Sequence, residues 1–263
     1  MSTDAVPFRD ATVAGVQRRG DLELLWSAVS DVGLVRETNE DAAFVADGRF
    51  LLADGMGGHD GGEVASENAL TALATVQPGE MAQTREAVVT ALGDAQHRIE
   101  DISPGSGRRA GTTVTGAVVV TYEDVDQWLV LNIGDSRTYR WSPDSFEQVT
   151  SDHSQVQELV DAGYLTPEQA RVDPRRNVIT RALGAGMDAE ADFFLFPVVR
   201  GEVLLVCSDG LTGELPDGEI AAIVAEHAVA DGPDPAALAT ELVQATLALG
   251  ARDNVTVVVV MVR

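Results

Sequence analysis

Four aspartates in this chain each lie beside an apolar run and next to glycine or another small residue. They are Asp54, Asp135, Asp209 and Asp253. If each run is a strand, the sheet fixes the carboxylate in place, and an adjacent glycine lets backbone oxygens and bulky ligands approach. Mg²⁺ and Mn²⁺ take oxygen ligands, keep several waters and need few protein carboxylates. The pattern therefore predicts a divalent metal site where the four strand ends meet.

A turn is the alternative interpretation for each of these places. Asp-Gly is a common turn dipeptide, so any single one could simply cap a hairpin. Four such places behind four apolar runs favour the metal site, because unpaired carboxylates repel one another unless cations neutralise them. This hypothesis requires that the four places converge in the folded chain.

The composition excludes several classes of enzyme and ligand. All 18 basic residues are arginine, which removes the P-loop lysine, the kinase lysine and any Schiff-base mechanism. The formal net charge is −24, whereas nucleic-acid binding needs clustered positive charge. We therefore expect no nucleic-acid partner, and a basic surface on a protein partner.

Cysteine usage and apolar run lengths bear on the cellular location. Cys207 is the only cysteine and cannot form an internal disulfide, which fits a reducing compartment. Residues Met1–Asp21 lack the apolar core of a secretory signal, and no stretch approaches the roughly 20 apolar residues that span a bilayer. These features predict a cytoplasmic chain without a membrane segment. A domain cut from a membrane-anchored parent would give the same pattern.

Apolar periodicity predicts a flexible lead-in over residues 1–20 and a single domain over 21–263. Dense apolar patterns indicate strands, and spacings of three and four indicate helices. The expected order is strands Leu22–Ser30 and Ala42–Ala53, helices Glu63–Val76 and Gln83–Ile102, a loop Ser103–Gly111, and strands Thr112–Thr121, Trp128–Ile133 and Arg137–Trp141.

A polar helical stretch, Ser154–Arg181, is broken by Pro167 and Pro174 and predicts a mobile surface insertion, or flap. After it we expect strands Phe193–Val199 and Val203–Ser208, helices Asp217–Ala230 and Pro235–Leu249, and a final strand Val255–Val262. Runs of strands alternating with pairs of helices predict an α+β fold with mostly antiparallel sheets.

The motifs, taken in order, resemble those of the metal-dependent protein phosphatases, the PPM or protein phosphatase 2C family, in its bacterial form. The similarity extends from about Ser27 to Val260. It rests on Arg36-Glu37-Thr38-Asn39-Glu40-Asp41, Ala53-Asp54-Gly55-Met56-Gly57-Gly58-His59, Gly111-Thr112-Thr113, Asn132-Ile133-Gly134-Asp135-Ser136-Arg137, Asp152-His153-Ser154, Ile179-Thr180-Arg181-Ala182-Leu183-Gly184, Ser208-Asp209-Gly210 and Asp253-Asn254. The resemblance implies a four-layer αββα sandwich, two mostly antiparallel sheets flanked by helix pairs, with metals at one end.

The resemblance also implies a role for each acidic residue. Asp54 would bridge two Mn²⁺ or Mg²⁺ ions, the Gly55 carbonyl would ligate one of them, and Asp209 and Asp253 would complete the other. Asp135, together with Asp209, would hold a third, weaker ion, and Asp41 would act through a water on a metal. Two ions that share a water lower its pKa and present it as the nucleophile, so no covalent enzyme intermediate is needed.

Arginine and histidine are the remaining candidates for chemistry. Arg36 matches the family's phosphate-gripping arginine, and a guanidinium fork suits phosphate oxygens; a surface salt bridge is the alternative. For Arg137 and Arg181 we expect structural ion pairs. His59 and His153 are the candidate general acids, but the histidine that follows Asp-Gly in eukaryotic members is here Met56. A water on a metal can supply the proton instead, and we expect structural roles for both histidines.

Other phosphatase and hydrolase chemistries fit the sequence less well. Cys207 lacks the following arginine that would cradle phosphate in a cysteine phosphatase, and we expect it to be a buried strand residue. Ser136 lacks the second glycine of a nucleophile elbow. Residues 54–63 lack the alternating oxygen side chains of a calcium-binding hand.

The resulting prediction is a monomeric phosphatase that removes phosphate from phosphoserine and phosphothreonine in proteins modified by bacterial Ser/Thr kinases. A catalytically inactive phosphoprotein-binding module is one alternative; it predicts lost metal aspartates, and all are present. A small-molecule phosphomonoesterase is the other, and it would differ mainly in the flap over Ser154–Arg181.

Overall fold

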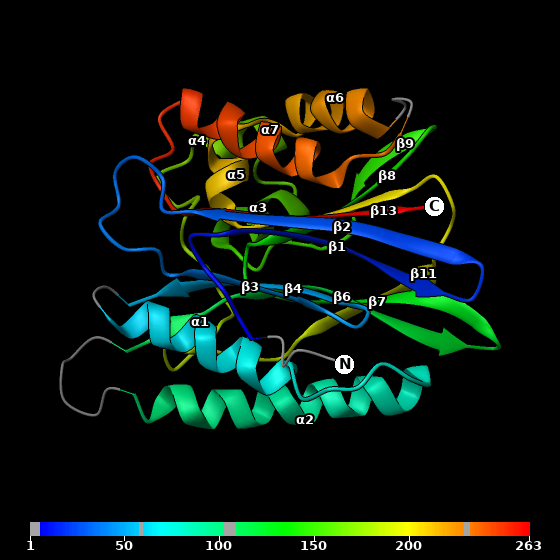
Figure 1. The fold of residues 1–263 in the computed structure, drawn as a ribbon. Helices are drawn as coiled ribbons and strands as arrows, with labels where there is room; N and C mark the ends of the chain where they lie inside the picture. Colours follow the sequence, from blue (N-terminus) through cyan, green and yellow to red (C-terminus); the bar gives the residue numbers. More distant parts are fainter. Residues whose placement is uncertain (1–5, 58–59, 103–108, 229–231) are drawn as a thin grey trace.

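The computed structural model describes residues 6–57, 60–102, 109–228 and 232–263. Two sheets stack face to face, and helices cover both outer faces (Figure 1). The first sheet has the order β1 (Thr12–Arg19), β2 (Leu22–Asp31), β13 (Val255–Val262), β12 (Val203–Cys207), β8 (Arg137–Ser142) and β9 (Ser145–Gln148). The second has the order β10 (Leu183–Gly184), β5 (Gly111–Thr112), β4 (Arg49–Met56), β6 (Val114–Tyr122), β7 (Val125–Ile133) and β11 (Asp192–Pro197), with β3 (Asp41–Ala46) beside β4.

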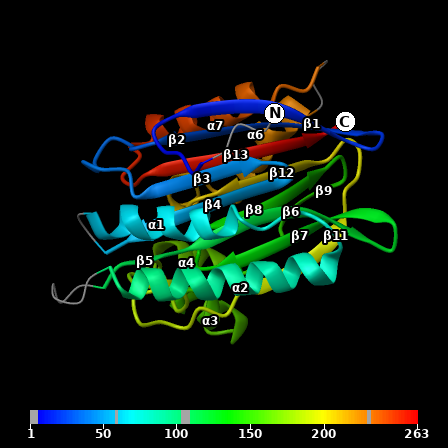
Figure 2. The same ribbon diagram turned by 60° about the horizontal axis from the view of Figure 1, so that its bottom comes forward.

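Helices cover the two sheets in separate groups. On the second sheet lie α1 (Asp60–Leu73) and α2 (Met81–Glu100), side by side across the strands in Figure 2. On the first sheet lie α5 (Asp209–Glu214), α6 (Asp217–Ala228) and α7 (Pro235–Ala248). All paired strands in the described residues are antiparallel. The predicted α+β class and αββα layering are confirmed.

The strand β13 shows how the layers are packed. Side chains alternate between the two faces of a strand. Val257 and Val259 therefore face the helices of the first sheet, whereas Val258 and Val260 enter the core between the sheets. A strand buried on both faces reads as a continuous apolar run, and every residue of β13 is buried.

The N-terminal region differs from the flexible lead-in predicted over residues 1–20, because part of it is a strand. Thr12–Arg19 form β1, which pairs with β2 along its whole length, from Thr12 opposite Val29 to Arg19 opposite Leu22. The connecting turn is Gly20-Asp21, and Gly20 has φ +59°, as a tight two-residue hairpin requires. Only alternate residues of this edge strand are half-buried, which leaves a weak apolar pattern.

Ala42–Ala53 was predicted as one strand and instead spans most of a hairpin. β3 and β4 are joined at Asp47-Gly48, and both residues have positive φ. Here the turn interpretation of Asp-Gly is the right one. The register places Asp41 directly opposite Asp54.

The predicted flap contains α3 (Gln155–Asp161) and α4 (Pro167–Val172). Pro167 begins α4 rather than breaking a helix, because its missing N–H is not needed in the first turn. Thr166 precedes it and forms a capping box with Gln169. Mobility of this segment stays a prediction.

Some predictions fall outside the described residues. These are His59, the first part of the Ser103–Gly111 loop, the last two residues of the Asp217–Ala230 helix, and the first five residues of the lead-in. Within the described residues, no helix combines the length and apolar character needed to cross a bilayer.

Candidate metal centre

Antiparallel pairing brings the four aspartate-bearing places to one end of the sandwich. β4 and β7 both flank β6 and run in the same direction, so Asp54 and Asp135 reach the same end of the second sheet. β12 and β13 are antiparallel neighbours, so Asp209 after β12 lies beside Asp253 before β13. All four line one cavity of about 520 Å³. The predicted convergence of the four places is observed.

Asp41 lies behind the cavity, at its junction with the core. Its side chain is 1 % exposed and is hydrogen-bonded by the hydroxyls of Ser208 and Thr256. Its Oδ2 atom is buried without a hydrogen-bond partner in the described part of the chain. Such an atom is costly unless a water or ion satisfies it.

The carboxylates are electrostatically unbalanced as a group. Burial, followed by repulsion from neighbouring carboxylates, raises the pKa of Asp54 and of Asp135 well above the ordinary value. Burial and the nearby Asp253 raise the pKa of Asp209 to about 6. Burial raises the pKa of Asp41 to about 7 against its two hydroxyl donors, with Asp209 and Asp253 adding to the rise. A cluster of this kind favours cations or protons.

Arg36 is the counter-charge on the rim of the cavity. Its Nη2 atom donates to Asp253 Oδ2 over 2.7 Å, and both side chains remain accessible. Arg36, Asp54, Gly55, Asp135, Asp209 and Asp253, the predicted site residues other than Asp41, therefore share one cavity.

Glycines permit the close approach that the site needs. A Cβ atom on Gly55 would clash with the Gly62 carbonyl and lie 2.6 Å from the Glu40 carbonyl. A Cβ atom on Gly210 would clash with the Asn254 carbonyl. Asp54-Gly55 therefore packs closely against α1, and Asp209-Gly210 packs closely against the Asn254 backbone. Neither dipeptide is at a hairpin turn.

Hydroxyl and amide side chains hold this backbone in place, and sequence reasoning assigned none of these roles. The Thr113 hydroxyl accepts a hydrogen bond from Asp54 N–H over 3.1 Å, and the Thr112 hydroxyl donates to the Asp54 carbonyl over 2.9 Å. The side-chain oxygen of Asn254 accepts a hydrogen bond from Glu40 N–H, and its side-chain nitrogen donates to the carbonyls of Val32 and Thr38 in the loop before β3. The Gly-Thr-Thr and Asp-Asn motifs were the available signals.

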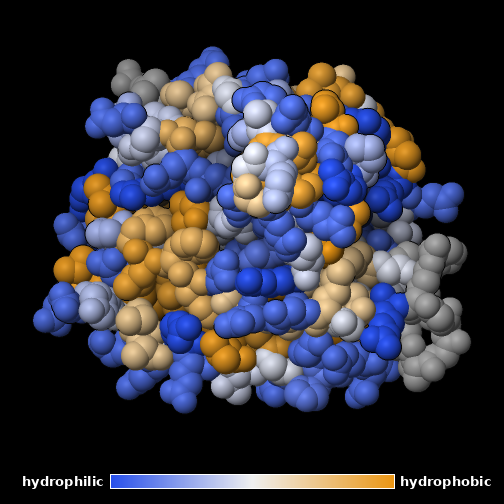
Figure 3. All heavy atoms as spheres, turned by 180° about the vertical axis from the view of Figure 1, so that it is seen from behind, coloured by the Kyte–Doolittle hydropathy of each residue, from blue (hydrophilic) through white to orange (hydrophobic). Residues whose placement is uncertain are grey.

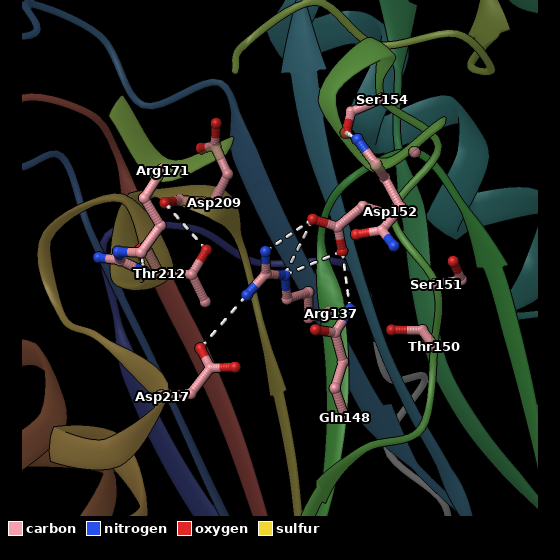
Figure 4. A network of polar contacts seen from close by, with 12 residues as sticks. Arg137, Gln148, Thr150, Ser151, Asp152, Ser154, Arg171, Asp209, Thr212 and Asp217 are labelled. Carbon is pink, nitrogen blue, oxygen red and sulfur yellow. Dashed lines mark hydrogen bonds and ion pairs between the residues drawn. The ribbon is translucent and has the colours of Figure 1, made fainter. Parts of the chain in front are cut away.

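Arg137 has the structural ion pairs that were expected. It donates to both carboxylate oxygens of Asp152, over 2.7 and 2.9 Å, and pairs with Asp217 over 3.3 Å (Figure 4). It also donates to the Tyr139 hydroxyl. Arg137, Asp152 and Asp217 line a second cavity of about 480 Å³, as do Asp135 and Asp209. Arg171 of α4 bonds to the Thr212 carbonyl and so connects the flap to α5.

The histidine and the second arginine near the site are likewise engaged. His153 accepts from Gly134 N–H through Nδ1 and contacts Asp192 through Nε2, so it supports the turn that carries Asp135. Arg181 pairs with Asp192 over 3.0 Å. Both arrangements agree with the structural roles expected for them.

Arg109 is a further cavity residue that the sequence had placed only in a loop. It lines the same cavity as Arg36. A Cβ atom on Gly186 would clash with its guanidinium, so the side chain extends over that glycine.

The cavity contains oxygen donors, but their side chains are not arranged as a complete cation site. Among the described residues, no three His, Cys, Asp or Glu side chains are arranged so that they could hold one ion. Asp253 faces Arg36 instead. Ions that keep several waters and need only one or two carboxylates each remain compatible with this donor set.

Comparison with known proteins gives the family. No family model matches. Protein phosphatase PhpP of Streptococcus pneumoniae is 35 % identical over 245 residues, which cover 89 % of this chain and 96 % of PhpP. Serine/threonine protein phosphatase PstP of Mycobacterium tuberculosis is 36 % identical over 245 residues, which are 92 % of this chain and 45 % of PstP. The chain therefore spans about half the length of PstP.

Solved structures agree with the sequence comparison. The catalytic domain of PstP, crystallised with two manganese ions, matches with a TM-score of 0.77 at 35 % identity, over 92 % of this chain and 99 % of that domain. The PstP domain therefore shares the layered fold of this chain. The chain belongs to the PPM family of Ser/Thr protein phosphatases.

Proposed function

We propose that this chain is a metal-dependent phosphatase that hydrolyses phosphoserine and phosphothreonine in proteins. The observation that carries the proposal is the meeting of Asp54, Asp135, Asp209 and Asp253 in one cavity with Arg36. Similarity to PhpP and PstP supports the reaction class.

The residues present fit divalent cations. Asp41 Oδ2 is buried without a partner in the described residues, and burial together with repulsion from neighbouring carboxylates raises the pKa of Asp54 and of Asp135. Mn²⁺, the ion in the PstP structure, or Mg²⁺ would satisfy both features. Asp54 would bridge two ions, with the Gly55 carbonyl on one of them and Asp209 and Asp253 on the other. Asp135 with Asp209 would hold a third, weaker ion.

When bound, the ions would supply a low-pKa water as nucleophile and neutralise charge on the phosphate. Arg36 would grip the phosphate oxygens with its fork. Its present partner Asp253 would then exchange Arg36 for a cation. Asp41 would orient a water with its unpartnered oxygen. Thr112 and Thr113 hold the backbone of Asp54 and would keep its carboxylate in place when ions bind.

The partners follow from the charge and the reaction class. Phosphorylated proteins, including substrates of bacterial Ser/Thr kinases, would be the physiological targets, and a net charge of −24 favours basic sequences around the phosphoresidue. We propose a monomer in the cytoplasm, with no nucleic acid as partner.

The test measures phosphate release from a phosphothreonine peptide with Mn²⁺ and with chelator, for the wild type and for Asp209→Asn. Loss of residues that merely orient metal ligands costs about 10- to 100-fold, so we expect the loss for Asp209→Asn to be at least that large. Asp144→Asn, in the exposed turn between β8 and β9, is the matched control and should keep full activity.

Three outcomes would change the conclusion. Equal phosphate release with chelator would remove the metal-dependent mechanism. Release from phosphorylated metabolites alone would favour a small-molecule phosphomonoesterase. Tight phosphopeptide binding without turnover would indicate an inactive binding module.

A further inference from the structure

The segment before β1 passes from the first sheet to the second. Residues Phe8–Ala11 are here called the N-terminal strap. At one end, the Ala11 carbonyl accepts from Ser30 N–H of β2 over 3.0 Å. At the other, Phe8 and Ala43 of β3 exchange two backbone bonds of 2.9 Å each. Figure 1 shows this dark-blue chain leaving β1 and descending toward α1.

Arg9 joins the strap to the two elements that surround Gly55. Its side chain is 17 % exposed, and Nη1 lies 3.0 Å from the Glu63 carboxylate of α1. The same guanidinium donates to the Asn39 carbonyl over 3.3 Å and to the Glu63 carbonyl over 3.1 Å. One cation thus connects the loop before β3 to the first turn of α1.

Asp10 grips the same loop through a side chain. Its Oδ1 atom accepts from Asn39 Nδ2 over 2.8 Å, and Asn39 Oδ1 accepts from Asp41 N–H over 3.1 Å. Asn39 is 3 % exposed, so a single buried amide connects the strap to the backbone of Asp41. Asp10 has φ +50°, which is unfavourable for a residue other than glycine and is held here by its neighbours.

The elements that Arg9 joins also contact the Gly55 backbone. Ser66 of α1 donates to the Glu40 carbonyl over 2.7 Å, and the same carbonyl accepts from Gly55 N–H over 3.2 Å. A Cβ atom on Gly62 would lie 2.8 Å from the Gly55 carbonyl carbon. Movement of α1 or of residues 39–41 would therefore shift Gly55 as well as Asp41.

We propose that the N-terminal strap is a positioning device for the metal centre, in which Arg9 and Asp10 hold Asp41 and the Gly55 carbonyl in the arrangement that binds divalent cations. This inference rests on the proposed function. Neither Arg9 nor Asp10 touches the reacting atoms; both act through Asn39 and α1. Removing either contact loosens the ligands and weakens metal binding while leaving the ligands themselves intact.

The test uses the full chain and calorimetric titration with Mn²⁺. Arg9→Gln removes the cation and should weaken Mn²⁺ binding by about tenfold, the low end of the loss seen when a residue that orients metal ligands is removed. Arg18→Gln is the matched control, because Arg18 lies on β1, is 82 % exposed and, among the described residues, pairs only with Glu23, over 2.7 Å. It should bind Mn²⁺ like the wild type.

A second variant removes the Asp10 contact without backbone strain. Asp10→Gly deletes the acceptor for Asn39, and glycine adopts φ +50° freely. Asp124→Gly is its control, since Asp124 also has positive φ (62°) but lies in the exposed turn between β6 and β7. Asp10→Gly should weaken Mn²⁺ binding and speed hydrogen exchange at residues 39–41, whereas Asp124→Gly should do neither.

Activity measurements separate positioning from general stability. For both strap variants, the Mn²⁺ concentration for half-maximal phosphopeptide hydrolysis should rise, while kcat at saturating Mn²⁺ stays near the wild-type value. Lower thermal midpoints in chelator with unchanged Mn²⁺ affinity would overturn the proposal and leave the strap a purely stabilising element. A wild-type chain that neither binds Mn²⁺ nor hydrolyses the peptide would instead contradict the proposed function.

Discussion

Arg36 is the proposed phosphate-binding residue, and its 2.7 Å ion pair with Asp253 occupies the guanidinium that phosphate would need. Arg36→Lys keeps the charge and loses the planar fork. A hydrogen bond to a charged group contributes about 1.5–3 kcal/mol, so we expect kcat/KM to fall roughly 10- to 100-fold. Steady-state kinetics on the phosphothreonine peptide measure this loss, and unchanged kinetics would indicate that Arg36 is a surface salt bridge.

Gly55 tests how closely the backbone must approach α1. In Gly55→Ala the new methyl group would meet two carbonyls, those of Gly62 and Glu40, and neither is the end of a flexible side chain. We expect weaker Mn²⁺ binding, measured by calorimetry, and a lower thermal midpoint, measured by circular dichroism. Gly93→Ala, in the middle of α2 with open space around it, should be neutral or slightly stabilising. A Gly55→Ala protein with wild-type metal affinity would show that the carbonyl is not a ligand.

At the scale of residues, the sequence predicted which acidic side chains come together, but it did not predict the hydrogen bonds that hold their backbone in place. Strand-end aspartates are recognisable because each follows or precedes a local apolar run. Thr113 and Asn254 act on backbone that is 59 and 214 positions away, and no local pattern reports such a contact. Arg109 was missed for the same reason, since its guanidinium lies against Gly186, which is far from it in the sequence.

At the scale of elements, the β3–β4 hairpin is the unit that pairs Asp41 with Asp54. Apolar content alone could not separate its two strands, because the Asp47-Gly48 turn interrupts the run for only two residues. β1 was missed because an edge strand buries one face only in part. Short or one-sided strands therefore lie near the limit of what periodicity can predict.

Arg49 anchors this hairpin to the end of α1. It is 4 % exposed and donates to the carbonyls of Ala46, Ala74 and Val76, and its guanidinium lies 5.1 Å from the centre of the Phe44 ring. Arg49→Leu leaves the three carbonyls without this donor, so we expect a loss of about 3 kcal/mol in the free energy of unfolding. Urea denaturation checks it, with the exposed Arg98→Leu of α2 as the control.

For the whole molecule, the pattern predicted the α+β class, the family resemblance implied the αββα layering, and the strand order could not be predicted. Within the described residues, β2 lies between β1 and β13, the first and last strands. Such distant pairing leaves no trace in a local window. The charge balance, 42 acidic against 18 basic residues, is a property of the entire surface, and the face in Figure 3 is largely hydrophilic with smaller apolar patches.

Raising the pH should destabilise the acidic cluster of the metal-free protein, whereas binding of Mn²⁺ should stabilise it. Burial raises the pKa of Asp209 to about 6 and of Asp41 to about 7, from an ordinary value of 3.8. The folded chain therefore holds extra protons on these two carboxyls between about pH 4 and 7, so their contribution to the stability of the metal-free protein is greatest below that range and falls as pH rises through it. Mn²⁺ competes with these protons, and its stabilising effect should grow over the same range. Thermal midpoints measured from pH 4.5 to 7.5, with chelator and with saturating Mn²⁺, should diverge as pH increases; parallel curves would mean that the clustered carboxyls do not bind the ion.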